Sequence, residues 1–333
     1  MPPYLLLSSK INFRELKVIE HLRQAKGKTL FSFEVLPPLK GDKIDNIFSA
    51  IDPLLEFDPK FINVTYHREE YVYKEKGNNL LEKFAIRKRP GTVGISVAIF
   101  MKYHIDVVPH LICGGFSKDE TEDALIELKF LGIDNILALR GDPIKTERTF
   151  VPTKGGHRYA SELIKQIVDM NGGKFLHDEI YENAPTDFCI GCAGYPEKHL
   201  ESLSLGVDLK HLKQKVDAGA DYIVTQLFYD NQKYFDFVDK CRAAGINVPI
   251  IPGLKPLGRK RHLSFIPKTF SVDFPDELTN QLENAKTDEA IGKIGQEWCI
   301  QQSKELIKAG VPCLHFYTMG NSTQVAEIAR QVF

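Results

Sequence analysis

Eight short runs of apolar and β-branched residues recur along the chain, and loops and helical patterns separate them. Strand–helix–strand order implies parallel strands joined by right-handed crossovers, so this repetition limits the fold more than any other feature. The runs are Lys28–Leu36, Phe61–Tyr66, Asp106–Cys113, Asn135–Arg140, Asp187–Ala193, Asp221–Phe228, Val248–Leu254 and Pro312–Tyr317. They predict an α/β fold, a closed (βα)8 (TIM) barrel, with a doubly wound open sheet as the alternative, because both folds bury both strand faces.

The helical patterns between these runs end at glycine residues, which readily adopt the backbone conformation that stops a helix. Glu120–Gly132 and Asp208–Gly219 both place apolar residues at helical spacing. Asp208 is the expected N-cap of the second of these helices. Gln232–Gly245 and Ala290–Gly310 repeat the pattern.

The expected domain organisation is a single barrel over residues 1–333, since this length suits one barrel with loop insertions. Residues 67–105 form an excursion between the second and third strands that is longer than one crossover helix needs. Its polar and aromatic first part, His67–Asn79, is expected to be a loop or cap over the barrel mouth. A variable surface excursion and a functional lid are both open interpretations.

Charge and cysteine usage restrict the partners and the compartment. A net charge of -1 argues against a nucleic-acid partner, which calls for a broad basic face. The six cysteines lie mostly in apolar runs, which favours a reducing compartment. Without a secretory pattern or an apolar run of about 20 residues, we expect a cytoplasmic protein with no membrane partner. Self-association into a homo-oligomer is left open.

Polar and aromatic groups stand at nearly every predicted strand end, where barrel enzymes place their active sites. Glu34 lies inside an apolar strand, so burial would raise its pKa and suit it to acid–base chemistry; a structural ion pair is the alternative. The chain has no G-x-G-x-x-G, P-loop, H-E-x-x-H or G-x-S-x-G motif. Cys189 and Cys192 would point to opposite faces of one strand, so we expect no metal site.

Ordered strand-end motifs carry a resemblance to a known family. They include Phe31–Glu34 followed by Pro37-Pro38, Val64–Tyr66, Pro109–Leu111, Leu139–Asp142, Tyr159–Ser161, Tyr195–His199, Leu212–Ala220, Thr225-Gln226, Ile251–Gly253 and His315–Thr318. Together they cover nearly the whole chain from about residue 28. On these motifs the chain resembles methylenetetrahydrofolate reductase, in its short bacterial form with a catalytic barrel only.

The resemblance implies a flavoprotein oxidoreductase that converts 5,10-methylenetetrahydrofolate to 5-methyltetrahydrofolate, supplying methyl groups for methionine synthesis. FAD is the implied cofactor, and NADH or NADPH would reduce it before the folate binds, in a ping-pong cycle. Glu34 matches the general acid that protonates the folate amine nitrogen and opens the five-membered ring to an iminium cation. Asp142 matches the aspartate beside the flavin and folate, where its charge would stabilise that cation.

The resemblance also assigns binding residues. Gln226, His262 and Thr65 match positions near the folate or the nicotinamide, although the loop containing His262 aligns loosely. The positions that match FAD contacts are Tyr66, His110, Arg140, Gly141, Asp142, Tyr159, Ala160, Tyr195, His199, Asp208 and Lys215. His262 and Asn321 replace a glutamine and an arginine that are frequent in the family, so the expected contacts to the folate tail are open. Another FAD barrel dehydrogenase, such as one acting on proline, and a folate- or flavin-binding protein without turnover are the competing functions.

Overall fold

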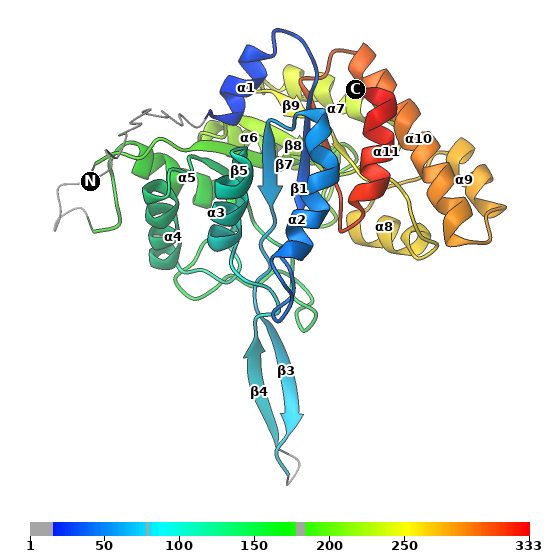
Figure 1. Ribbon diagram of the computed structural model, residues 1–333. Coiled ribbons are helices and arrows are strands. Elements are labelled where there is room, and N and C mark those ends of the chain that lie inside the picture. The colour runs from blue at the N-terminus through cyan, green and yellow to red at the C-terminus, as the bar shows by residue number, and fades with distance from the viewer. Residues whose placement is uncertain (1–15, 78–79, 178–183) are drawn as a thin grey trace, which may run out of the picture.

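Parallel strands form the centre of the protein, whose computed structural model describes residues 16–77, 80–177 and 184–333 (Figure 1). The parallel strands are β1 (Leu30–Val35), β2 (Phe61–Val64), β5 (Asp106–Ile112), β6 (Asn135–Leu139), β7 (Cys189–Gly194), β8 (Tyr222–Thr225), β9 (Ile250–Ile251), β10 (Gly253–Leu254) and β11 (Cys313–Tyr317). Each lies within one of the eight predicted runs, extended by one residue at Gly194. The predicted seventh strand is divided at Pro252 into β9 and β10.

The sheet closes on itself through this divided strand. Neighbouring strands follow the order β10-β11-β1-β2-β5-β6-β7-β8-β9, so β9 and β10 meet the two ends of one continuous sheet. Across the break, the backbone N–H of His315 donates to the carbonyl oxygen of Pro252 at 3.0 Å. The (βα)8 barrel is therefore confirmed, and the open doubly wound sheet is excluded.

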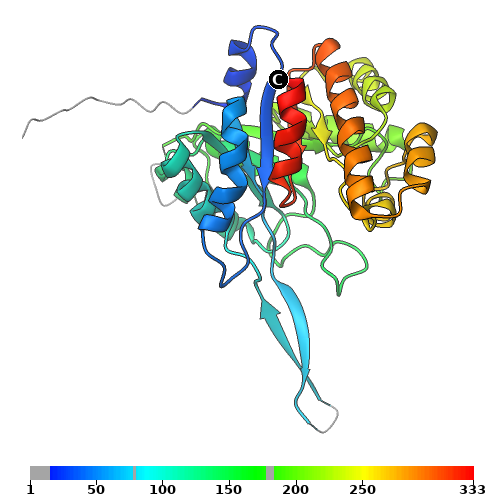
Figure 2. The same ribbon diagram turned by 45° about the vertical axis from the view of Figure 1, so that its right-hand side comes forward.

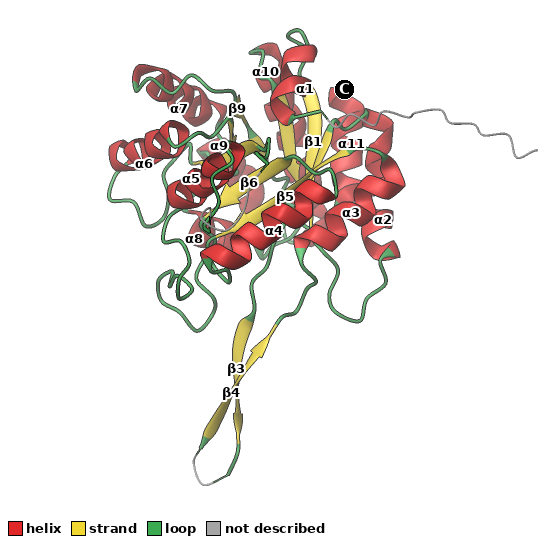
Figure 3. Cartoon of the chain, turned by 90° about the vertical axis from the view of Figure 1, so that its left-hand side faces the viewer, coloured by secondary structure: helices red, strands yellow, loops and turns green. Residues whose placement is uncertain are grey.

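Helices surround the barrel on its outer side (Figure 3). The helices are α1 (Val18–Gln24), α2 (Asp45–Ile51), the 3-10 helix η1 (Asp52–Phe57), α3 (Thr92–Tyr103), α4 (Lys118–Phe130), α5 (Ala160–Asn171), α6 (Leu205–Asp217), α7 (Asn231–Ala243), α8 (His262–Phe270), α9 (Asp276–Glu283), α10 (Asp288–Lys308) and α11 (Ser322–Val332). The four expected helices correspond to α4, α6, α7 and α10. No helix in the described ranges is both long and apolar enough to cross a bilayer; a cytoplasmic location stays a prediction.

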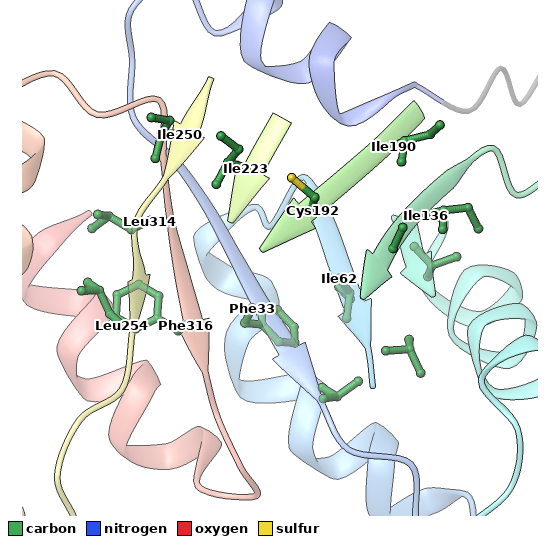
Figure 4. Packing of buried hydrophobic residues seen from close by; sticks show 14 of the residues in the cluster. Phe33, Ile62, Ile136, Ile190, Cys192, Ile223, Ile250, Leu254, Leu314 and Phe316 are labelled. Atoms are coloured by element: carbon green, nitrogen blue, oxygen red, sulfur yellow. The ribbon is translucent and has the colours of Figure 1, made fainter. Parts of the chain in front are cut away.

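Alternation along each strand divides the apolar side chains between two cores. Outward-facing residues such as Phe33, Ile62 and Phe316 pack under the helices (Figure 4). Inward-facing residues such as Phe61 and Tyr222 fill the N-terminal end of the barrel, where Val18 of α1 covers them. Complete burial of one large apolar side chain contributes about 1.5–3 kcal/mol, so both cores fix the strand register.

The CxxC pair follows the same alternation. Cys189 belongs to the inner core and Cys192 to the outer core. The prediction that they face opposite sides of the strand is confirmed, and both thiols are free and buried.

The excursion at residues 67–105 differs from its prediction as a loop or cap. Its first part forms an antiparallel hairpin of β3 (Glu70–Glu75) and β4 (Leu81–Ile86), with Glu70 paired to Ile86. The hairpin extends away from the barrel instead of covering its mouth (Figures 1 and 2). Both faces of the ribbon meet solvent over most of its length, so its strands lack the apolar alternation that identifies a half-buried strand. The prediction of one domain over residues 1–333 stays a prediction, because residues 1–15 lie outside the described ranges.

Candidate active site

A cavity of about 660 Å³ opens at the C-terminal ends of the barrel strands. Most of the residues predicted to form the site line it: Glu34, Thr65, His110, Arg140, Gly141, Asp142, Tyr159, Ala160, Tyr195, His199, Asp208, Lys215 and Gln226. The barrel brings these residues together from positions almost 200 apart in the sequence, because parallel strands present all their carboxyl ends on one side.

Glu34 places a mostly buried carboxyl group in this cavity, with 14% of its side chain exposed. It lies at the end of β1, in register with Asn63 of β2 and Tyr317 of β11. Burial raises the pKa of Glu34 to about 8, and the positive charge of Lys255 opposes that rise. The carboxyl is therefore protonated at neutral pH and can act as an acid.

His110 is a titratable neighbour of Glu34, with 3.6 Å between its Nε2 and a carboxyl oxygen. Burial lowers the pKa of His110 to about 3, so the imidazole is neutral at pH 7. The pair is thus a neutral imidazole beside a carboxylic acid and not an ion pair at neutral pH. This geometry argues against the structural ion pair considered for Glu34.

A polar layer lies inside the barrel close to Glu34. The side chains of Asn63 and His110 approach to 3.2 Å, and Ser32 Oγ lies 2.9 Å from His315 Nδ1. Asn63 Oδ1 and His315 Nε2 are buried and have no hydrogen-bond partner in the described part of the chain. Burial lowers the pKa of His315 to about 3, so this layer carries no positive charge at neutral pH.

Arg140 and Asp142 flank Gly141 at the end of β6. Gly141 has a φ of 84°, a left-handed conformation that strains any other residue, and both of its neighbours line the cavity. Arg140 Nη1 donates to Glu201 at 2.5 Å, and its guanidinium lies 5.0 Å from the centre of the Phe150 ring. The cationic group is thereby held at the cavity wall.

Helix α6 and the loop after β7 form the wall beside Arg140. Lys215 Nζ donates to the Ala193 carbonyl oxygen at 2.6 Å, and Asp208 accepts hydrogen bonds from the backbone of His199 and from Ser202 Oγ, each at 3.0 Å. The prediction of Asp208 as the N-cap is wrong. The helix begins one residue after Ser204, whose Oγ accepts from Val207 N. Asp208 lies within the first turn, where its carboxylate fixes the loop.

The remaining predicted cavity residues are less restrained. Thr65 Oγ1 is buried without a hydrogen-bond partner among the described residues, and it faces the cavity. Gln226 Oε1 accepts a hydrogen bond from the next backbone N–H, that of Leu227, at 2.9 Å. Tyr159 is 53% exposed at the start of α5, beside Ala160. These side chains have polar atoms or ring surface left for a ligand.

Tyr66 and His262 are the two predicted site residues that do not line the cavity. Tyr66 Oη accepts a hydrogen bond from Arg87 at 3.0 Å, and the Tyr66 ring packs against Phe116. His262 begins α8, and its Nδ1 accepts from the backbone of Gly258 at 3.2 Å. Their expected contacts to ligands stay predictions.

Several cavity residues were not identified from the sequence. Glu201, His211, Gln214 and Phe270 also line the cavity. His211 lies three residues after Asp208 and four before Lys215, so helical spacing from these two predicted residues could have identified it. Phe270 lies at the end of α8, far from any strand end, and gave no comparable signal.

Comparisons with known proteins agree with this geometry. The sequence profile of the family described as methylenetetrahydrofolate reductase matches residues 17–332. Methylenetetrahydrofolate reductase 1 of Schizosaccharomyces pombe is 34% identical over 92% of this chain, which covers 46% of that protein. The chain spans about half the length of such eukaryotic relatives. The 5,10-methylenetetrahydrofolate reductase of Pectobacterium carotovorum is 31% identical, with 91% of this chain and 90% of that protein covered.

A solved structure supports the fold. An uncharacterized protein from Clostridium thermocellum, which binds two copies of 5-methyl-5,6,7,8-tetrahydrofolic acid, superposes with a TM-score of 0.53 at 15% identity, covering 93% of this chain and 97% of its own. At that identity the likeness concerns the fold alone. The profile match over nearly the whole chain and the end-to-end bacterial relative show that the chain belongs to the methylenetetrahydrofolate reductase family.

Proposed function

We propose that this protein reduces 5,10-methylenetetrahydrofolate to 5-methyltetrahydrofolate, with FAD as its bound cofactor and NAD(P)H as the source of electrons. The observation that carries the proposal is the buried, protonated carboxyl of Glu34 in the same cavity as Asp142, within a chain of this family. The product would supply methyl groups for methionine synthesis.

The residues of the cavity fit a dinucleotide such as FAD. A volume of about 660 Å³ lies within the range of small-molecule sites, and its wall includes apolar Leu137, Ala138 and Leu139. Arg140 and Lys215 supply cationic donors on one side, where a pyrophosphate would be favoured. Bound FAD would supply the hydride chemistry, accepting electrons from NAD(P)H and passing them to the folate.

Glu34 would act on the folate itself. Its carboxyl proton goes to the amine nitrogen of the five-membered ring, and the bond from that nitrogen to the bridging carbon breaks as the ring opens. The bridging carbon then carries a positive charge, which the carboxylate of Asp142 would stabilise. The neutral His110 places no competing positive charge beside Glu34. Thr65 and Gln226 offer unengaged polar atoms to the substrate side of the cavity.

The test separates the two half-reactions. Purified protein reconstituted with FAD is mixed anaerobically with NADH or NADPH, and loss of flavin absorbance is followed by stopped flow. Methylenetetrahydrofolate is then added to the reduced protein, and the absorbance should return. Failure to bind flavin overturns the cofactor assignment. Flavin reduction without folate-dependent reoxidation overturns the substrate assignment and would favour another flavin barrel dehydrogenase or a binding protein.

A further inference from the structure

Lys255 is a buried cation at the end of β10, which is separated from β1, the strand that carries Glu34, by β11. It follows directly after β10, where Leu254 is in register with Phe316 of β11, and Tyr317 is in register with Glu34 of β1. Leu254 packs in the outer core, so alternation directs Lys255 toward the barrel interior. The residue is 5% exposed and does not line the cavity, so it lies behind the residues that would touch a ligand.

Two hydrogen bonds through Thr318 connect Lys255 to the backbone of Glu34. Its Nζ donates to the carbonyl oxygen of Thr318 at 3.4 Å, a long hydrogen bond for a buried ammonium. The hydroxyl of the same Thr318 donates to the backbone carbonyl oxygen of Glu34 at 2.7 Å. Burying a cation costs several kcal/mol unless a nearby anion compensates for its charge. Two acidic groups, Cys299 and Glu34, raise the pKa of Lys255. Burial raises the pKa of the Cys299 thiol to about 12 and that of Glu34 only to about 8, so Glu34 is the one of the two that ionises closer to neutral pH.

We propose that Lys255 is a positioning residue for the folate half-reaction, whose buried ammonium acts through Glu34 and controls how readily that carboxyl releases its proton. The proposal rests on the proposed function. Proton release turns Glu34 into a carboxylate in a site of low polarity, and the positive charge of Lys255, which lowers the pKa of Glu34, stabilises that carboxylate. Lys255 therefore makes the buried acid stronger without touching the substrate.

The other titratable and charged groups around Lys255 and Glu34 cannot replace this charge. Burial lowers the pKa values of His110 and His315 to about 3 and that of His262 to about 4, so these rings are neutral near pH 7. Burial raises the pKa of Cys299 to about 12 and that of Tyr317 well above its usual value, so both are neutral as well. Arg259 is exposed, and its charge lowers the pKa of Lys255, so it acts against the buried ammonium and does not substitute for it.

Lys255 itself carries a proton at neutral pH. Burial lowers its pKa to about 8; Arg259 acts in the same direction, and Cys299 and Glu34 act in the opposite direction. Burial also raises the pKa of Glu34 to about 8, with Lys255 opposing. Removing the ammonium therefore raises the pKa of Glu34 further. The acid then keeps its proton to higher pH, but it gives that proton up less readily at neutral pH.

The experiment measures both consequences in Lys255→Met. The rate at which methylenetetrahydrofolate reoxidises the reduced protein is measured as a function of pH. The midpoint of its alkaline decline should lie about one pH unit higher than in the wild type. The rate near pH 7 should fall on the order of a few-fold, since a weaker acid transfers its proton more slowly. Infrared titration supplies a readout without turnover, because the protonated-carboxyl band that is absent in Glu34→Gln should persist to higher pH in Lys255→Met.

Two further variants keep the test specific. Lys255→Arg retains the charge and should return the midpoint toward that of the wild type. Lys260→Met removes an exposed cation from the same loop and should leave the midpoint unchanged. An unchanged midpoint and an unchanged carboxyl band in Lys255→Met, with altered thermal stability only, overturn the positioning role. A wild-type protein that reduces its flavin but shows no reoxidation by the folate overturns the proposed function itself.

Discussion

The two sides of the cavity satisfy their polar groups in opposite ways. On one side, His110 is buried and Glu34 is mostly buried, and burial displaces their pKa values strongly toward their neutral forms. On the other side, Arg140 pairs with Glu201, and Lys215 donates to the Ala193 carbonyl oxygen. The first arrangement leaves a proton available for transfer, whereas the second fixes permanent charges in place.

This difference indicates which side of the cavity is suited to proton transfer and which is suited to binding a cofactor. Groups whose pKa values are strongly displaced by burial in a cleft are candidates for proton transfer. Hydrogen-bonded cations at a cavity wall suit recognition of a phosphate, since their charges need no change during a reaction. We therefore propose that the proton-transfer step belongs to the Glu34 side, called the acid side, and FAD retention to the Arg140 and Lys215 side, called the cationic side.

The largest expected effect comes from Glu34→Gln, which removes the proton but keeps the size of the side chain. Reoxidation by the folate should slow by about 10²–10⁴-fold, the usual contribution of a general acid. Flavin reduction by NAD(P)H should remain near the wild-type rate, because it needs no proton from Glu34. Stopped-flow measurement of each half-reaction checks both statements.

Glu201→Gln is the matched control, a carboxylate removed from the cationic side of the same cavity. Because Glu201 holds Arg140 in place, this substitution should weaken FAD binding more than it slows reoxidation by the folate. Equal losses of both half-reactions in Glu34→Gln would make Glu34 a structural residue and would remove the distinction between the two sides.

A smaller effect is expected for Lys215→Met on the cationic side. One charged hydrogen bond contributes about 1.5–3 kcal/mol, so the Kd for FAD should rise about 10- to 100-fold. Fluorescence titration of the apoprotein with FAD measures this change. Lys213→Met removes the neighbouring lysine of the same helix, which pairs with Asp217 outside the cavity, and should leave the Kd unchanged. Equal weakening by both substitutions would indicate a loss of helix stability and not of a ligand contact.

The two sides should also differ in their response to pH. Because the pKa of Glu34 is raised to about 8, its carboxyl holds the proton below that pH and loses it above. The rate of folate reoxidation should therefore be constant on the acidic side and fall about tenfold for each pH unit well above the midpoint. Flavin reduction should lack this decline. A midpoint close to the ordinary glutamic acid value would contradict the buried, protonated state of Glu34.

Strand-end reasoning predicted most of the polar residues that line the cavity, but it did not point to Lys255 or to the cavity residues on helices. The eight strands were visible because their apolar runs bury both faces, and alternation then directs Glu34 and Thr65 inward. Lys255 was missed because it lies between Leu254 and Pro256, directly after a predicted strand, where a lysine is usually an exposed loop residue. Burial at this position depends on the register of β10 with β11, which the sequence does not contain. His211 and Gln214 were missed because they line the cavity from a helix and not from a strand end.

The β3–β4 hairpin belongs to neither the acid side nor the cationic side of the cavity. Its removal tests whether these two sides alone are enough for FAD binding and for both half-reactions. Glu70 and Ile86 are paired across the base of the hairpin, so residues 71–85 can be replaced by Asn-Gly, which closes a two-residue turn. None of the described residues of that segment lines the cavity, and β4 is exposed along its whole length. Both half-reactions should therefore stay within about twofold of the wild type, as for surface changes away from buried features. The contact of Arg87 with Tyr66 remains in this variant, so a loss of FAD binding or of either half-reaction would show that the hairpin itself completes the site.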